Sequence, residues 1–78
     1  MDIGQNIVDD ENTDQDEARK NLRAFCENGF DGDTDKAAEV LGRRSADIRA
    51  MLNGESLIDD DLAMKVRGIA DKRGIEVD

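Results

Sequence analysis

Apolar residues along most of the chain recur at intervals of three or four positions, the spacing that places side chains on one face of a helix. The pattern begins near residue 17 and continues almost to the end of the chain. Four groups of apolar positions define four predicted helices: Leu22, Phe25 and Cys26; Ala37, Ala38 and Leu41; Ile48, Met51 and Leu52; and Ile58, Leu62, Val66, Ile69 and Ala70. No stretch alternates between apolar and polar residues for long enough to form a sheet. The predicted fold class is therefore all-α, a small four-helix domain.

Turn and capping residues give the predicted ends of these helices. Residues suited to cap a helix N-terminus precede the last three helices, in the turn 31–35, at Ser45 and at 59–61. Glycines suited to the left-handed conformation end the helices at Gly29, Gly42, Gly54 and Gly74. Phe30, Ile75 and Val77, which follow the first and last helices, are expected to pack against the core.

The acidic residues are concentrated at the start of the chain. The sequence of 78 residues has 20 Asp and Glu against 11 Lys and Arg, a net charge of −9. Residues 1–17 contribute seven of the acids and no base, so the remaining residues carry a net charge of only −2. A segment this acidic and poor in apolar residues cannot bury enough surface to offset the entropy of ordering it. We therefore expect a disordered acidic tail over residues 1–17 and one domain over residues 18–78.

The composition excludes several kinds of active and metal-binding sites. The chain has no His, so Ser-His-Asp and Cys-His mechanisms and imidazole metal ligands are ruled out. Its single Cys, Cys26, cannot form an internal disulfide or a thiolate zinc site. No apolar run is long enough to span a membrane, and the first residues lack the pattern of a signal peptide. We expect a non-enzymatic, cytoplasmic protein that uses no metal or other cofactor and does not associate with membranes.

Residues 37–54 satisfy the physical requirements of two helices joined by a tight turn. Ala38 is small enough to let the helices approach, Gly42 permits the turn, and Ile48 anchors the second helix on the first. With Ala37-Ala38, Leu41-Gly42, Ile48 and Asn53-Gly54 in this register, the stretch resembles the lambda-repressor-like (Cro-type, xenobiotic-response-element) helix-turn-helix family. Residues 66–75 are similar to the family's next helix, so the resemblance covers residues 18–78.

The resemblance implies that the second of these helices is a recognition helix, which enters the major groove of DNA with its N-terminal side chains against base edges. Carried over by position, the DNA-binding residues would be Arg43, Arg44, Ser45, Ala46, Asp47, Arg49 and Ala50. Residues 36–54 hold four basic and two acidic residues, so this part of the chain is locally basic. The expected function is that of a small transcriptional regulator that binds double-stranded DNA. A homodimer is expected for an operator that is an inverted repeat.

A second function, protein binding on the same fold, stays open from the sequence. Ala46, Asp47 and Ala50 lack the forked amide or guanidinium groups that make bidentate contacts with bases. The turn at 31–35 adds three acids, which would repel the phosphate backbone. An acidic module such as an antitoxin, an anti-sigma-like factor or a DNA mimic would instead use these acids and the tail to engage a basic protein partner.

Overall fold

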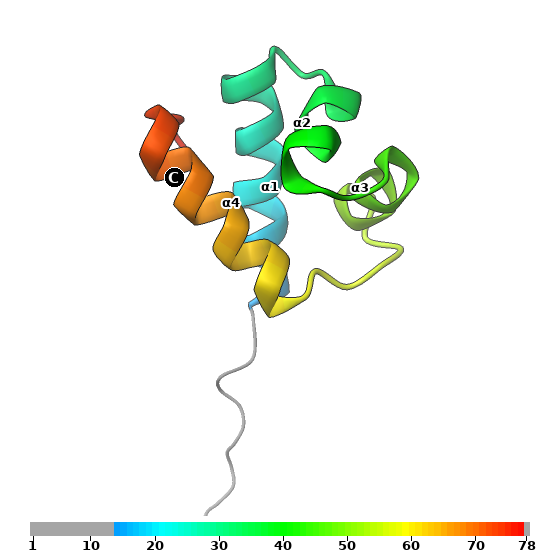
Figure 1. The fold of residues 1–78 in the computed structure, drawn as a ribbon. Coiled ribbons are helices and arrows are strands. Elements are labelled where there is room, and N and C mark those ends of the chain that lie inside the picture. The colour runs from blue at the N-terminus through cyan, green and yellow to red at the C-terminus, as the bar shows by residue number, and fades with distance from the viewer. Residues whose placement is uncertain (1–13, 78) are drawn as a thin grey trace, which may run out of the picture.

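The computed structural model of the protein describes residues 14–77, which contain four helices and no strand. The helices are α1 (Gln15–Phe30), α2 (Thr34–Leu41), α3 (Ser45–Leu52) and α4 (Asp60–Arg73). α1 contacts each of the other three helices, whereas α3 contacts α1 and α2 (Figure 1). The prediction of a four-helix, all-α domain is confirmed for this part of the chain. None of the four helices is long and apolar enough to cross a membrane.

The core lies where the inner faces of all four helices meet. Its largest fully buried side chains are Leu22, Phe25, Leu41, Ile48 and Leu62. Every apolar position that predicted a helix is buried, except Leu52 and Ile69, which are partly buried at the edge of the core. Phe30 also packs against the core, and its ring centroid lies 5.3 Å from that of Phe25. The apolar spacing therefore identified the inward face of each helix.

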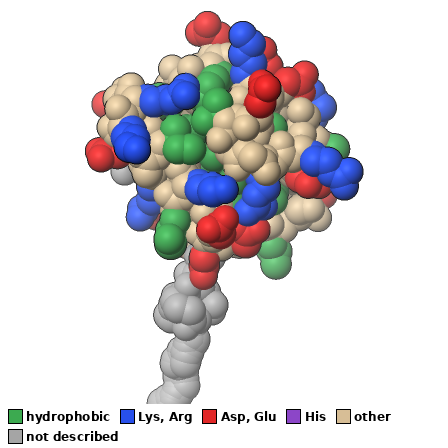
Figure 2. Space-filling view, viewed as in Figure 1, with side chains coloured by type: hydrophobic (Ala, Val, Ile, Leu, Met, Phe, Trp, Pro, Cys, Tyr) green, Lys and Arg blue, Asp and Glu red, His purple; other side chains and the backbone are tan. Residues whose placement is uncertain are grey.

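Charged side chains of both signs are interspersed on one face of the domain (Figure 2). On the face drawn in Figure 2, neither the basic nor the acidic side chains form a continuous patch. Residues 14–77 include 15 acidic and 11 basic residues, a net charge of −4. The exposed large hydrophobic residues in this part of the chain are Leu57 and Met64, whose exposed fractions are 76% and 68%.

α1 begins earlier than the sequence pattern indicated. The Asp14 side chain caps the helix by accepting hydrogen bonds from the backbone N–H groups of residues 16 and 17. The Gln15 amide donates to the Ile58 carbonyl at 2.9 Å and accepts from the Ile58 N–H at 2.8 Å. These two bonds fasten the first turn to the loop before α4. Residues 14–17, which the sequence places in the acidic tail, therefore belong to the helical domain, and the rest of the predicted tail, residues 1–13, lies outside the described residues.

The prediction that Gly29 ends the first helix is wrong. The helix continues through Phe30, and its left-handed C-terminal residue is Asp31, with φ of 54°. Gly29 serves a different purpose, because a Cβ atom at this position would lie 2.5 Å from Cδ1 of Ile75. The missing side chain lets the segment after α4 pack directly against the α1 backbone, a tertiary contact that local sequence cannot reveal.

A double-mutant cycle tests this explanation of Gly29. Gly29→Ala alone is expected to destabilise the protein by about 1 kcal/mol, because overpacking against Ile75 exceeds the gain in helix propensity. In an Ile75→Ala background the clash is absent, so Gly29→Ala should stabilise the protein by about 1 kcal/mol. Urea unfolding of the four proteins measures both values. If Gly29→Ala changed the free energy of unfolding in the same direction in both backgrounds, the assigned contact between Gly29 and Ile75 would be contradicted.

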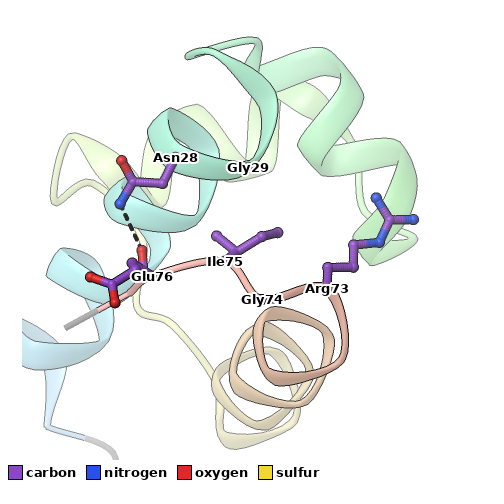
Figure 3. A pocket seen from close by; sticks show the side chains of 6 residues that line it. All are labelled: Asn28, Gly29, Arg73, Gly74, Ile75 and Glu76. Atoms are coloured by element: carbon purple, nitrogen blue, oxygen red, sulfur yellow. Dashed lines mark hydrogen bonds between the residues drawn. The ribbon is translucent and has the colours of Figure 1, made fainter.

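The segment after α4 folds back onto α1, as predicted. Ile75 points toward Gly29, and Asn28 Nδ2 donates to the Glu76 carbonyl at 2.7 Å (Figure 3). Ile75 and Val77 are partly buried against the core. An open surface hollow of about 560 Å³ lies between this segment and the end of α1. The Arg73 guanidinium, which also lines this hollow, lies 5.7 Å from the centre of the Phe30 ring, within range of a cation–π interaction.

The other helix ends follow the sequence except at α3. Asp33 and Asp59 cap α2 and α4 through their side chains, and Gly42 and Gly74 end the same helices in the left-handed conformation. The prediction of Ser45 as the cap of α3 is wrong by one residue. Arg44 occupies the cap position, and its carbonyl accepts from the N–H groups of residues 47 and 48. No side chain caps the N-terminus of α3.

Candidate nucleic-acid interface

α3 presents one face to the core and the opposite face to solvent. It follows α2 after a turn of three residues, 42–44, in which Gly42 has φ of 72°. Ile48 and Met51 hold its inner face in the core. The outer side contains five of the predicted site residues: Ser45, Ala46, Asp47, Arg49 and Ala50. Ser45 and Ala50 are half-buried, and the other three are exposed, so the structure brings these residues together on one accessible surface.

Two arginines of α1 hold the C-terminal end of α3. Arg19 Nε donates to the Met51 carbonyl at 3.1 Å, and Arg23 Nη2 donates to the Leu52 carbonyl at 3.0 Å. The last carbonyls of a helix lack partners within the helix and carry partial negative charge, so guanidinium groups are well suited to them. Sequence reasoning missed both residues. Their spacing of four places them on one face of α1, but no local pattern pairs that face with a helix end some 30 residues away.

Arg43 is bound to α4 rather than presented to a ligand. Its two terminal nitrogens each lie 3.1 Å from an Asp59 oxygen, and one of them lies 3.6 Å from Asp61. Only 24% of the Arg43 side chain is exposed. This bidentate pair connects the α2–α3 turn to the N-terminus of α4. Arg43 therefore joins these two elements in the structure, and its contact with DNA stays a prediction.

The ion pair also changes the ionisation of both partners. The hydrogen bond from Arg43 lowers the pKa of Asp59, and the backbone N–H of Leu62 lowers it further. The hydrogen bond to Asp59 raises the pKa of Arg43, which keeps the guanidinium charged. Because the folded pKa of Asp59 lies below its unfolded value, the pair stabilises the fold at pH above about 3.9, the ordinary value for Asp. That stabilisation is lost as the pH falls through the folded pKa.

Asp59→Asn isolates this contribution, since asparagine caps a helix about as well as aspartate. The variant should be less stable than the natural protein by about 0.5–1 kcal/mol at pH 7. The difference should disappear as the pH falls below the folded pKa of Asp59, because the natural protein then loses the same charge. Urea unfolding from pH 7 to pH 2 measures the difference, with Asp71→Asn as an exposed control on the same helix. A difference that persists at the lowest pH would contradict the assigned pair.

Arg44 and Arg49 remain at the surface of the turn and of α3. Arg49 Nη2 lies 3.0 Å from Asp35 Oδ1, and Arg44 Nε lies 4.0 Å from Asp47 Oδ2. The exposed fractions of these two arginine side chains are 58% and 86%. Exposed ion pairs contribute only about 0–1 kcal/mol, so another anion can replace either carboxylate at small cost. These two arginines, unlike Arg43, are therefore accessible to a phosphate.

Each of the two accessible arginines on this side of the domain is paired with a carboxylate. Arg49 lies beside Asp35 of α2, and Arg44 lies beside Asp47 of α3. Within the described residues, no group of three or more acidic or Cys side chains is placed to hold a metal ion. The face therefore carries two accessible guanidinium groups, each with one carboxylate beside it.

Cys26 lies on the inner face of α1 and is buried. Burial raises the pKa of its thiol, and the charge of Glu27 raises it further. A thiol with a raised pKa is protonated near neutral pH and is a poor nucleophile. The residue acts as a small member of the core, in agreement with its place in the apolar pattern.

Comparison of the chain with protein-family models, with curated proteins and with solved structures found no significant match.

Proposed function

We propose that the protein is a small non-enzymatic DNA-binding protein, a transcriptional regulator of the lambda-repressor-like helix-turn-helix type. α3 would lie in the major groove. The observation that carries the proposal is the outer face of α3, where short side chains are flanked by two accessible guanidinium groups, Arg44 and Arg49. The α2–α3 turn and the buried Ile48 hold this face at the surface.

The short side chains suit close approach to base edges. Ser45 can hydrogen-bond to a base, and Ala46 and Ala50 can contact the methyl group of thymine. The N-terminus of α3 carries no side-chain cap, so the N–H groups of its first two residues, Ser45 and Ala46, can donate to a phosphate oxygen. Arg44, beside this terminus, and Arg49, one turn along α3, can bind further phosphates. The mechanism therefore depends on close helix approach and few charge contacts.

The proposal predicts weak and salt-sensitive binding. With about two to three phosphates neutralised, affinity should fall roughly 10- to 40-fold between about 50 and 200 mM salt. Titration of the full chain into a fluorescent duplex of mixed sequence, followed by anisotropy at both concentrations, measures the fall. No binding at the lower salt concentration would count against DNA as the ligand.

The second candidate function is binding of a basic protein partner. It is favoured by the pairing of the three arginines with acids, since Arg43, Arg44 and Arg49 each have a different carboxylate within 4.0 Å. These contacts neutralise the positive charge that DNA would require, and residues 14–77 as a whole carry a net charge of −4. On this alternative, the surface resembles DNA in charge rather than binding it.

Replacing Asp35 and Asp47 together by asparagine distinguishes the two functions. If DNA is the ligand, release of Arg49 and Arg44 should raise affinity for the duplex about 10-fold, equivalent to about 1.4 kcal/mol. If a basic protein is the ligand, the double variant should still not bind the duplex. The loss of two acids should also weaken the binding of the protein to an immobilised oligolysine peptide. Glu27→Gln together with Asp71→Asn, two exposed positions on α1 and α4, serves as the matched control because it makes the same change of two charges.

A further inference from the structure

Two asparagines of the chain, Asn28 and Asn53, are each followed directly by glycine. Asparagine in this setting can react with its own backbone, because the nitrogen of the next residue can attack the carbonyl carbon of the side chain. Glycine favours the attack, since it has no Cβ atom and allows the backbone to rotate into the required geometry. The structure places the two pairs in contrasting surroundings, so we expect their reactivities to differ.

The pair Asn28-Gly29 is protected by the fold. Both residues lie inside α1, where backbone N–H groups donate to the carbonyl four residues earlier. The Asn28 side-chain amide donates to the Glu76 carbonyl at 2.7 Å, and Ile75 packs against Gly29 (Figure 3). Reaction here requires the end of α1 to open and the segment after α4 to move away from it.

The pair Asn53-Gly54 lies in the exposed turn after α3. Asn53 is the C-terminal cap of that helix, and Gly54, with φ of 82°, lies outside it. Within residues 14–77, no hydrogen bond holds the side-chain amide of Asn53. The fold therefore does not restrain this amide as it restrains that of Asn28.

The backbone nitrogen of Gly54 is also weakly held. Its N–H donates to the Met51 carbonyl at 3.2 Å, at the long end of the range for such bonds. The same carbonyl accepts from Arg19 Nε at 3.1 Å. The guanidinium carbon of Arg19 lies 3.9 Å from a Cβ atom built on Gly54, so a positive charge stands beside this nitrogen. A nearby cation favours the deprotonated nitrogen, which is the form that attacks.

We propose that Asn53 is a site of spontaneous deamidation, with water as the co-reactant. The Gly54 nitrogen forms a bond to Cγ of Asn53 as the bond from Cγ to Nδ2 breaks, and Nδ2 leaves as ammonia with the proton of the Gly54 nitrogen. Water then opens the cyclic imide, supplies the hydroxyl of the new carboxyl group and returns a proton to the Gly54 nitrogen. Opening at Cγ gives aspartate, and opening at the backbone carbonyl carbon gives isoaspartate.

The products change the C-terminal end of α3. Each of them carries a negative charge that asparagine lacks. Isoaspartate also adds a carbon atom to the backbone, directly before the residues 54–56 whose N–H groups donate to the carbonyls of Ala50 and Met51. The inference does not rest on the proposed DNA binding, because no ligand takes part in the reaction.

Incubation of the folded full chain in warm, mildly alkaline buffer tests the proposal. The tryptic peptides 24–36 and 50–65 each contain a single asparagine, so the gain in mass of each peptide reports on one site. Asn53 should react at least about 10-fold faster than Asn28, because about 1.4 kcal/mol of additional free energy for opening α1 is enough to produce that ratio.

The same chain unfolded in guanidinium chloride is the matched control, and the two asparagines should react there at similar rates. In an Asn53→Gln variant, peptide 50–65 should keep its mass, because the longer side chain forms a ring much more slowly. The proposal would be overturned if Asn53 of the folded chain reacted no faster than Asn28, or if it reacted only after unfolding. The same gain in mass in the Asn53→Gln peptide would also overturn it.

Discussion

Replacement of Arg44 and Arg49 together by glutamine is expected to weaken binding to duplex DNA about 100-fold at low salt. Each charge-assisted hydrogen bond to a phosphate contributes about 1.5 kcal/mol, and the loss of two such bonds corresponds to about 3 kcal/mol. The free energy of unfolding should change by less than about 0.5 kcal/mol, because both side chains are exposed and their ion pairs are weak. Anisotropy titration and urea unfolding of the same samples measure the two effects.

Arg43→Gln is the matched control, with the same chemical change one residue away. Its guanidinium holds Asp59 through two hydrogen bonds, so its loss should lower the free energy of unfolding by about 1 kcal/mol. DNA affinity of the folded variant should change much less than that of the double variant. If Arg43→Gln abolished DNA binding while the double variant bound normally, the division of roles among the three arginines would be wrong.

Ile48→Ala is expected to have the largest effect on stability. Ile48 is fully buried and joins α3 to the core. Loss of an isoleucine side chain in such a site costs about 2–5 kcal/mol. A domain of this size has a total stability on the order of 4–12 kcal/mol, so the variant would lose a large part of it. Chemical unfolding followed by circular dichroism measures the change.

Leu52→Ala provides the comparison, since Leu52 belongs to the same helix but is only partly buried. Its truncation should lower the free energy of unfolding about half as much as that of Ile48, because it removes less buried apolar surface and leaves a smaller cavity. Equal costs at the two positions would mean that α3 is not oriented with Ile48 toward the core. The orientation of its outer face, and with it the candidate interface, would then need revision.

The number of helices and their inward faces could be predicted because they depend on local spacing. The apolar residues of each helix recur with the helical period, and Asp33, Gly42 and Gly74 act through their own backbone neighbourhoods. Gly29 could not be interpreted correctly, because its role depends on contact with Ile75 at the other end of the chain. The sequence assigns the N-cap of α3 to Ser45, one residue after the true cap, Arg44. Serine suits both the cap and the first turn of a helix, so the pattern does not distinguish the two positions.

The candidate site was predictable as a set of positions but not as a set of contacts. The structure places the predicted residues Ser45, Ala46, Asp47, Arg49 and Ala50 on the outer side of α3, and their role in binding stays a prediction. It could not show that Arg43 is bound by Asp59, because the net charge of a segment does not reveal which acids fold against its bases. The hydrogen bond from Arg19 to the end of α3 could not be predicted either, because it joins residues that are far apart in the sequence.

Selection of bound fragments from random duplex DNA tests the central claim most directly. The full chain should enrich one sequence at about 50 mM salt, and most of this enrichment should be lost at about 200 mM salt. The Arg44→Gln, Arg49→Gln double variant should enrich no sequence at either concentration. Arg43→Gln should enrich the same sequence as the natural chain. No enrichment at either salt concentration would contradict DNA binding by α3 and would favour the second candidate function, binding of a basic protein.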